Sequence, residues 1–288
     1  MIQNYLSLIK FSHTIFALPF AIIGYFLGLL SKSFHFEINI FILVVLCMIF
    51  ARSAAMAFNR YIDRDVDQLN PRSSNREIPS GIIKPKNALI FVIINCVLFI
   101  LCTFFINDLC FYLSPVALLV ILGYSLTKRF TFLCHLVLGL GLSLAPIGAY
   151  IAVTNEFSVI SILFGFSVLF WVAGFDIIYA LQDEYFDKNQ NLYSIPSYFG
   201  GKRALNIAKL LHAASIIFIS IACYSAITFY QQLGIFTYFG LFIFIALIIY
   251  QHSLVKYNDL SKVNIAFFTT NGFASVIFCT FFLLDYFL

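Results

Sequence analysis

The chain is poor in charged residues. Only 10% of its 288 residues are charged, whereas 62% are hydrophobic, and the mean hydropathy is +0.97. This composition excludes an ordinary soluble domain and predicts an integral membrane protein in a lipid bilayer. The net charge of +4 comes with no separate basic domain, so no nucleic-acid partner is expected.

Several reactive groupings are also missing. The seven cysteines are scattered through apolar segments without a CxxC pair, which excludes a disulfide framework. The five histidines lack metal-ligand spacing among themselves and are expected to be packing or interfacial residues. No Ser-His-Asp or Cys-His nucleophile is evident. The first apolar run is not followed by a small-residue cleavage site, so we expect it to be retained as a membrane span.

Long apolar runs dominate what is present. Most approach the roughly 20 residues that cross a bilayer as a helix. The run from 113 is short, and its Pro115 is tolerable in a first helical turn. We predict one all-α domain, residues 1–288, forming a bundle of about nine transmembrane helices at 14–30, 38–58, 88–106, 113–126, 132–153, 159–181, 207–230, 233–254 and 263–288.

Lysine and arginine are distributed unevenly between alternate loops. With nine helices, the loops around Asn107, Asn155 and Gln231 carry neither residue, while the loops of the other side carry nearly all of them. Cytoplasmic loops are enriched in Lys and Arg, so this asymmetry predicts a cytoplasmic N-terminus. It also places the ends of the second and sixth helices on the same, cytoplasmic side.

Those two helix ends carry the acidic residues. In the first motif, Asn59, Asp63 and Asp67 recur every four residues, which gives one oxygen-bearing stripe on a helix. In the second, Asp176, Asp183 and Asp187 are spaced by seven and four, which predicts a second stripe of the same kind. Carboxylates that cluster at membrane depth repel each other, so they indicate a bound metal ion or a proton path.

The order of features repeats along the chain. An acidic helix end, the tripeptide Ile-Pro-Ser, a basic residue and a new helix occur at 59–89 and again at 176–205. We therefore predict two pseudo-repeated halves, at about 1–130 and 131–288, that share a site between them.

The loops after the motifs are rich in arginine and lysine. Mg²⁺ prefers oxygen ligands and commonly links carboxylates to phosphate oxygens, while Arg and Lys bind the remaining phosphate charge. An amphiphile with a diphosphate head and a long hydrocarbon tail fits both the acidic helix ends and the apolar helices.

At the level of motifs, the segment NRYIDRDVDQLNPRSSNREIPSG resembles the first aspartate-rich motif of the UbiA family of intramembrane aromatic prenyltransferases, and DIIYALQDEYFD resembles the second. The opening IKFSHTIFALPFA resembles the first helix of its 4-hydroxybenzoate polyprenyltransferase-like branch, which includes the prenyltransferase of the futalosine route to menaquinone. Many members carry Asp where this chain has Arg60, so one possible metal ligand is absent.

The resemblance implies roles for particular residues. Asn59, Asp63 and Asp67 would bind one Mg²⁺, and Asp183 and Asp187 a second one through the diphosphate, so the four aspartates are the catalytic candidates. Basic residues near the motifs would hold the diphosphate, and Lys10 would pair with the carboxylate of the aromatic acceptor. The remaining candidates for substrate binding are Arg72, Arg76, Lys128, Tyr124, Asp176 and Tyr179.

The implied activity is Mg²⁺-dependent transfer of a polyprenyl group from polyprenyl diphosphate to a hydroxylated aromatic acid in quinone biosynthesis. The acceptor is 4-hydroxybenzoate or 1,4-dihydroxy-6-naphthoate, or that of another UbiA-type enzyme, and no obligate protein partner is evident. The expected location is the bacterial inner membrane, with the site open to the cytoplasm.

Two other functions share some of these features. An ion-coupled transporter also uses intramembrane aspartates and two-half repeats, but its acids are expected midway through the membrane rather than at helix ends beside arginines. A CDP-alcohol phosphatidyltransferase would carry a DG-x2-AR motif, which the chain lacks.

Overall fold

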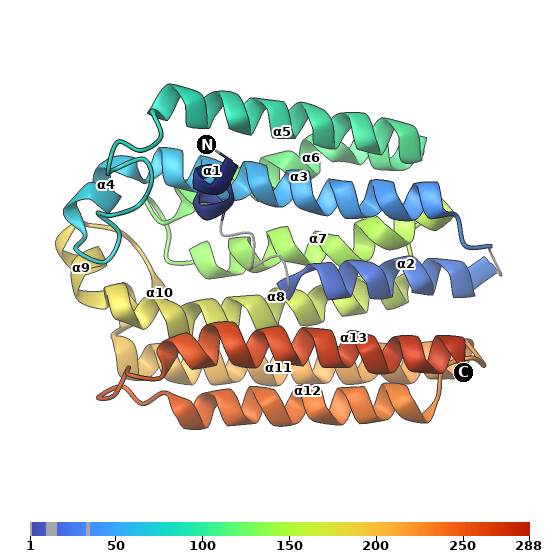
Figure 1. The fold of residues 1–288 in the computed structure, drawn as a ribbon. Coiled ribbons are helices and arrows are strands. Elements are labelled where there is room, and N and C mark those ends of the chain that lie inside the picture. Colours follow the sequence, from blue (N-terminus) through green and yellow to red (C-terminus); the bar gives the residue numbers. More distant parts are fainter. Residues whose placement is uncertain (1, 10–15, 33–34) are drawn as a thin grey trace.

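The computed structural model describes residues 2–9, 16–32 and 35–288, and almost all of them lie in helices or in short connections. The helices run alongside one another over most of the molecule (Figure 1). They are α1 (Ile2–Leu8), α2 (Leu18–Lys32), α3 (Ile38–Ile62), α4 (Arg64–Leu69), α5 (Pro85–Ile106), α6 (Asp108–Thr127), α7 (Cys134–Thr154), α8 (Val159–Ala180), α9 (Glu184–Asn189), α10 (Ile195–Phe199), α11 (Gly201–Phe229), α12 (Ile235–Leu254) and α13 (Asn271–Phe287).

The expected number of membrane helices is confirmed within the described residues. Eight helices are long and apolar enough to cross a bilayer, and the shorter apolar helix Leu18–Ser31 makes the ninth. The last span begins with a π-helical turn, Ile265–Thr270, that leads directly into α13. The chain is therefore a multi-pass integral membrane protein.

The fourth predicted helix is longer than its apolar run. It begins at Asp108 rather than at 113, because the Asn107 side chain caps it by accepting a hydrogen bond from the Cys110 N–H. Pro115 consequently lies inside the helix and not in its first turn. Proline leaves the carbonyl four residues earlier without its usual donor. Here the Ser114 hydroxyl donates to that carbonyl, Phe111 O, at 2.8 Å.

Helix α8 lies at the centre of the bundle. It packs against α7 on one side and α11 on the other, while α3 packs against α5 and α2 against α7. Its Trp171 is fully buried against the aromatic rings of Phe20 from α2 and Phe244 from α12, and its indole N–H donates to Asn271 of α13 at 3.0 Å. Burial of these large rings is the main packing contribution, since each removes a large contact area from the surrounding lipid or water.

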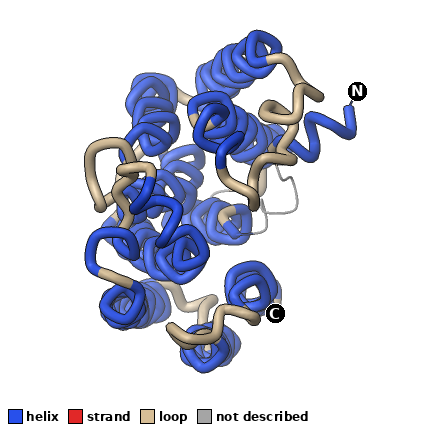
Figure 2. The backbone as a smooth tube through the Cα atoms, turned by 90° about the vertical axis from the view of Figure 1, so that its left-hand side faces the viewer, coloured by secondary structure: helices blue, strands red, loops and turns tan. Residues whose placement is uncertain are grey.

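The short helices α4, α9 and α10 gather at one end of the bundle (Figure 1). Figure 2 looks onto this end, with the long helices seen nearly end-on. This end receives both acidic motifs. Helix α3 stops at Ile62, just before Asp63, and α8 stops at Ala180, where the 3₁₀ turn Leu181–Asp183 precedes α9. The prediction of one continuous stripe from Asp176 to Asp187 is therefore wrong, because the tighter turn rotates the later aspartates relative to Asp176.

We expect Gly24→Ala to destabilise the fold. A Cβ at this position would lie 2.2 Å from the Pro146 carbonyl oxygen of α7, so the two helix backbones would have to separate. Overpacking of this kind costs about 1–3 kcal/mol, and the melting temperature of the purified protein in detergent should fall. The matched control is Gly123→Ala in α6, whose Cβ would meet nothing within 4 Å. Equal melting temperatures for the two variants would contradict the close α2–α7 contact.

The loop asymmetry makes a second prediction, for membrane orientation. A cysteine replacing exposed Asn75 should react with a membrane-impermeant maleimide only from the cytoplasmic side, whereas one replacing exposed Glu156 should react from outside. Labelling of intact cells and of inverted vesicles distinguishes the two faces. The unsubstituted chain, with its seven native cysteines, gives the background signal. Reaction of both positions on one face would mean that the orientation is wrong.

Candidate active site

Asp63 is buried at the junction between α3 and α4, with 2% of its surface exposed. Two cations from the loop after α6 reach it: Lys128 Nζ lies 3.0 Å from one carboxylate oxygen and Arg129 Nη2 lies 3.2 Å from the other. The Asn59 amide, one turn earlier, donates to the same carboxylate at 3.1 Å. A buried carboxylate needs such partners, so these contacts fix the end of α6 against the end of α3.

Asp67 is neutralised by the loop that follows it. Arg76 Nη1 lies 2.6 and 2.8 Å from the two carboxylate oxygens of Asp67, which is 5% exposed. The Ser73 hydroxyl donates to the backbone carbonyl of Asp67 at 3.2 Å. The loop therefore folds back over its own acidic motif.

Arg72 joins the two motifs. Its Nε donates to Asp183 Oδ1 at 3.0 Å, its Nη2 pairs with Oδ2, and the Asn70 amide also donates to Oδ1, at 3.2 Å. The guanidinium lies 5.0 Å from the centre of the Tyr179 ring. Burial opposes the charge of Arg72, but Asp183 and Tyr179 outweigh it and raise the pKa of this arginine. The expected convergence of segments more than a hundred residues apart is thus confirmed.

The other two acids of the second motif have different surroundings. Asp187 is 9% exposed and lies near Lys128, Asp183 and His135. Asp176 instead accepts a hydrogen bond from His135 Nδ1 at 2.7 Å, and His135 Nε2 accepts from the Ile195 N–H at 3.3 Å. Because Nε2 is an acceptor, the proton of a neutral ring sits on Nδ1.

His135 was not predicted to have a role beyond packing. Its two hydrogen bonds connect α7 to α8 and α10, and so hold Asp176 beside the loop that follows the second motif. No spacing in the sequence signals this pair, since its members are 41 residues apart on separate helices.

The aspartates have the chemistry of a magnesium site but are paired with cations. Among the described residues, no three His, Cys, Asp or Glu side chains come together closely enough to hold a metal ion. The donors at this end are carboxylate and carboxamide oxygens, the ligands that Mg²⁺ prefers. The donor set therefore fits Mg²⁺ by kind.

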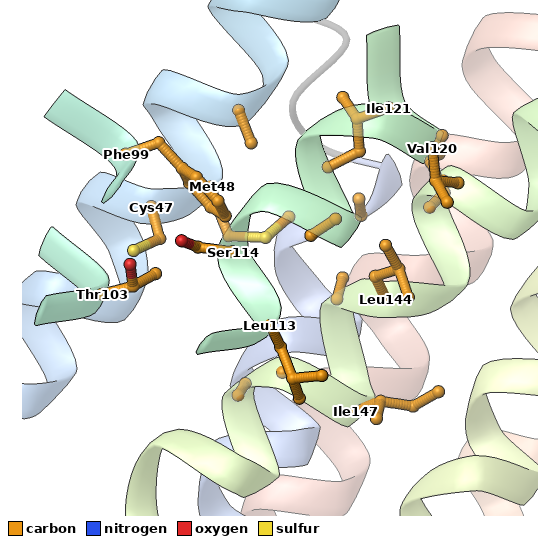
Figure 3. Close-up of a pocket in the computed structure, with 18 of the residues that line it drawn as sticks. Cys47, Met48, Phe99, Thr103, Leu113, Ser114, Val120, Ile121, Leu144 and Ile147 are labelled. Atoms are coloured by element: carbon orange, nitrogen blue, oxygen red, sulfur yellow. The ribbon is translucent and has the colours of Figure 1, made fainter. Parts of the chain in front are cut away.

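An apolar cavity of about 320 Å³ lies between α3, α5, α6 and α7. Figure 3 shows its lining side chains, which are almost all hydrocarbon. Tyr124 lines this cavity, and the charges of Asp63 and Asp176 in the acidic motifs act on its hydroxyl group. The cavity and the acidic cluster therefore adjoin at Tyr124.

Arg52 also lines the cavity, and its role was missed in the sequence. It belongs to α3, and its buried Nε has no hydrogen-bond partner. An arginine inside an apolar span is a functional candidate by default, so position 52 in the run 38–58 was the available signal. Of the other predicted site residues, Lys10 lies outside the described part of the chain.

These features define a class of membrane protein. It is a bundle of membrane-length helices with paired carboxylates and cations at one end, next to an apolar cavity. The UbiA prenyltransferase family matches residues 17–276. The chain belongs to this family.

Curated relatives include two proteins named 4-hydroxybenzoate octaprenyltransferase. The one from Aliivibrio salmonicida (strain LFI1238) is 32% identical over 185 residues, 64% of each chain, and the one from Aliivibrio fischeri (strain MJ11) is 35% identical over 163 residues, 56% of each. The chain thus matches little more than half of each relative's own length. An apo UbiA homolog from Aeropyrum pernix K1 has a TM-score of 0.84 at 29% identity, covering 95% of this chain and 98% of that one.

A UbiA homolog from Archaeoglobus fulgidus, solved with DMAPP and Mg²⁺ bound, has a TM-score of 0.78. It is 21% identical, and the match covers 98% of both chains. At this identity the likeness supports the fold alone. Together these structures agree with the all-helical architecture of the chain.

Proposed function

We propose that this protein transfers a polyprenyl group from polyprenyl diphosphate to the ring of a hydroxylated aromatic acid, with Mg²⁺ as cofactor. The observation that carries the proposal is the joining of both acidic motifs by Arg72 and Asp183 next to an apolar cavity. Membership of the UbiA family and the relatives named 4-hydroxybenzoate octaprenyltransferase support it. The names of these relatives favour 4-hydroxybenzoate as the acceptor over 1,4-dihydroxy-6-naphthoate. Both acceptors carry a carboxylate.

The acidic residues would hold the metal. Asn59, Asp63 and Asp67 would bind one ion, and Asp183 and Asp187 another, as oxygen donors. Bound Mg²⁺ neutralises the charge that develops on a departing diphosphate. A homolog with the same fold, solved with DMAPP and Mg²⁺ bound, supports a divalent metal cofactor.

The basic residues would hold the diphosphate itself. Arg72, Arg76 and Lys128 each contact an aspartate directly. When the aspartates serve as metal ligands, these side chains become available for phosphate oxygens, which they bind by charge-assisted hydrogen bonds. Each aspartate and each basic side chain would then exchange one oppositely charged partner for another, and none would face lipid without a partner.

The cavity would receive the hydrocarbon part of the prenyl donor and the acceptor ring. Arg52 provides a partly buried cation whose buried Nε has no partner among the described residues, which suits the acceptor carboxylate, and Lys10 is the second candidate for that contact. The allylic C–O bond breaks, a ring carbon ortho to the hydroxyl forms the new C–C bond, and the ring proton is lost. Catalysis of this kind depends on positioning and electrostatic stabilisation, without a covalent enzyme intermediate.

Neutralising a single carboxylate in either motif should stop turnover. We expect Asp63→Asn and Asp183→Asn each to lower the rate about 100-fold or more, because each removes a ligand charge. The assay follows transfer from geranyl diphosphate to 4-hydroxybenzoate in proteoliposomes with Mg²⁺. The matched control is Asp65→Asn, since the Asp65 side chain is 81% exposed and pairs with Arg64. Wild-type activity in either test variant would exclude the two-motif site.

The position of Arg52 in the cavity leads to a separate prediction for the acceptor. Arg52→Gln should raise the KM for 4-hydroxybenzoate about 10- to 100-fold, the worth of one hydrogen bond to a charged group, with a much smaller change for geranyl diphosphate. Lys10→Ala, tested in parallel, shows whether that residue shares the role.

The control for this experiment is an acceptor without the carboxylate, such as phenol. If Arg52 pairs with the carboxylate, wild type and Arg52→Gln should use phenol equally poorly. A similar loss with both acceptors would assign Arg52 to the structure of the cavity instead.

A further inference from the structure

Arg60 is a buried cation that makes no ion pair within the described part of the chain. It lies in the last turn of α3, only 6% of its surface is exposed, and its Nε makes no hydrogen bond. No ion pair joins its guanidinium to any acid in the described part of the chain. A buried, unpaired charge is strongly unfavourable, so this position indicates an anion that binds there.

The groups around Arg60 do not supply that anion. Asp67 and Glu77 are the acids close enough to act on it electrostatically, together with Arg76 and Tyr124. Asp67 already has Arg76 on both carboxylate oxygens, and Glu77 accepts a hydrogen bond from the Ser7 hydroxyl at 2.5 Å. Other groups therefore already engage both nearby acids, and neither acid accepts a hydrogen bond from the Nε of Arg60.

Arg60 and Arg52 lie at different positions along the axis of α3. The two arginines are eight residues apart, which is about 12 Å of helix rise. Arg52 lines the apolar cavity, whereas Arg60 follows Asn59 directly and precedes Asp63 by less than one turn. Arg60 thus lies at the level of the carboxylates, where the diphosphate head would sit and the acceptor ring would not.

We propose that Arg60 binds the diphosphate of the prenyl donor directly, without an intervening metal ion. This inference rests on the proposed function. Arg72, Arg76 and Lys128 are each paired with an aspartate that shares their charge, whereas Arg60 makes no ion pair among the described residues. It provides the first contact for the incoming diphosphate and positions it while the other cations exchange partners.

The test measures binding rather than turnover. Geranyl thiolodiphosphate, a donor analogue that does not ionise readily, is titrated into detergent-solubilised protein by calorimetry, once with Mg²⁺ and once with EDTA. Arg60→Gln should weaken binding about 10- to 100-fold in both conditions, as expected for a lost hydrogen bond to a charged group. Arg60→Lys should recover part of the affinity, since it keeps the charge but not the planar fork.

Arg64→Gln is the matched control. Arg64 is four residues further along and partly exposed, its Nη1 donates to the Tyr61 carbonyl at 2.8 Å, and its Nε lies 3.6 Å from Asp65. This variant should bind the analogue as wild type does. A second measurement is thermal stability: inorganic diphosphate in EDTA should raise the melting temperature of the wild type, and should raise that of Arg60→Lys by less.

The outcomes separate the inference from the proposed function. If the wild type binds no analogue even with Mg²⁺, the proposed function fails. If the wild type binds but Arg60→Gln binds equally well, or is weakened only with Mg²⁺, direct contact by Arg60 is excluded. A loss confined to 4-hydroxybenzoate binding would likewise overturn it. If Arg60→Gln does not fold, Arg60→Lys decides, because unchanged affinity and stabilisation in EDTA would exclude the role.

Discussion

The rest of the structure depends on the need to neutralise carboxylates at the end of a membrane bundle. Asp63, Asp67 and Asp183 are each held by a cation from another element or from a folded-back loop. An ionised carboxylate without such a partner would be very unfavourable there. Satisfying these charges fixes the loop after α4, the end of α6 and the start of α9 in relation to one another.

The helices were largely predictable because a membrane span needs about 20 apolar residues, a strong signal in sequence. Their ends were not, since polar residues continue them. Asn107 starts α6 before its apolar run, and α11 begins at Gly201, whose N–H donates to Glu184 at 3.1 Å. The two residues of this hydrogen bond are 17 positions apart, so no local pattern records it. The two-half repeat stays a prediction.

The acidic half of the candidate site was predictable because Asp and Asn repeat at helical spacing beside arginines. The arginine and histidine residues inside the bundle were not predictable in this way. Arg52 and Arg60 lack local partners, and His135 finds Asp176 only when α7 packs on α8. What distinguishes these residues is burial without a neighbouring countercharge, or with one far along the chain. A periodic pattern in one sequence does not record either property.

The positions of Arg52 and Arg60 also set a distance between the two substrates in the proposed reaction. Both belong to α3, which is straight enough in Figure 1 for residue spacing to give their separation along its axis. If Arg60 holds the diphosphate and Arg52 the acceptor carboxylate, the two anions are held from backbone positions about 12 Å apart along one helix. Like charges are then separated, while the allylic carbon and the acceptor ring both fall in the apolar space between them. A single helix thereby positions both substrates, which is the contribution that an enzyme without a covalent nucleophile has to make.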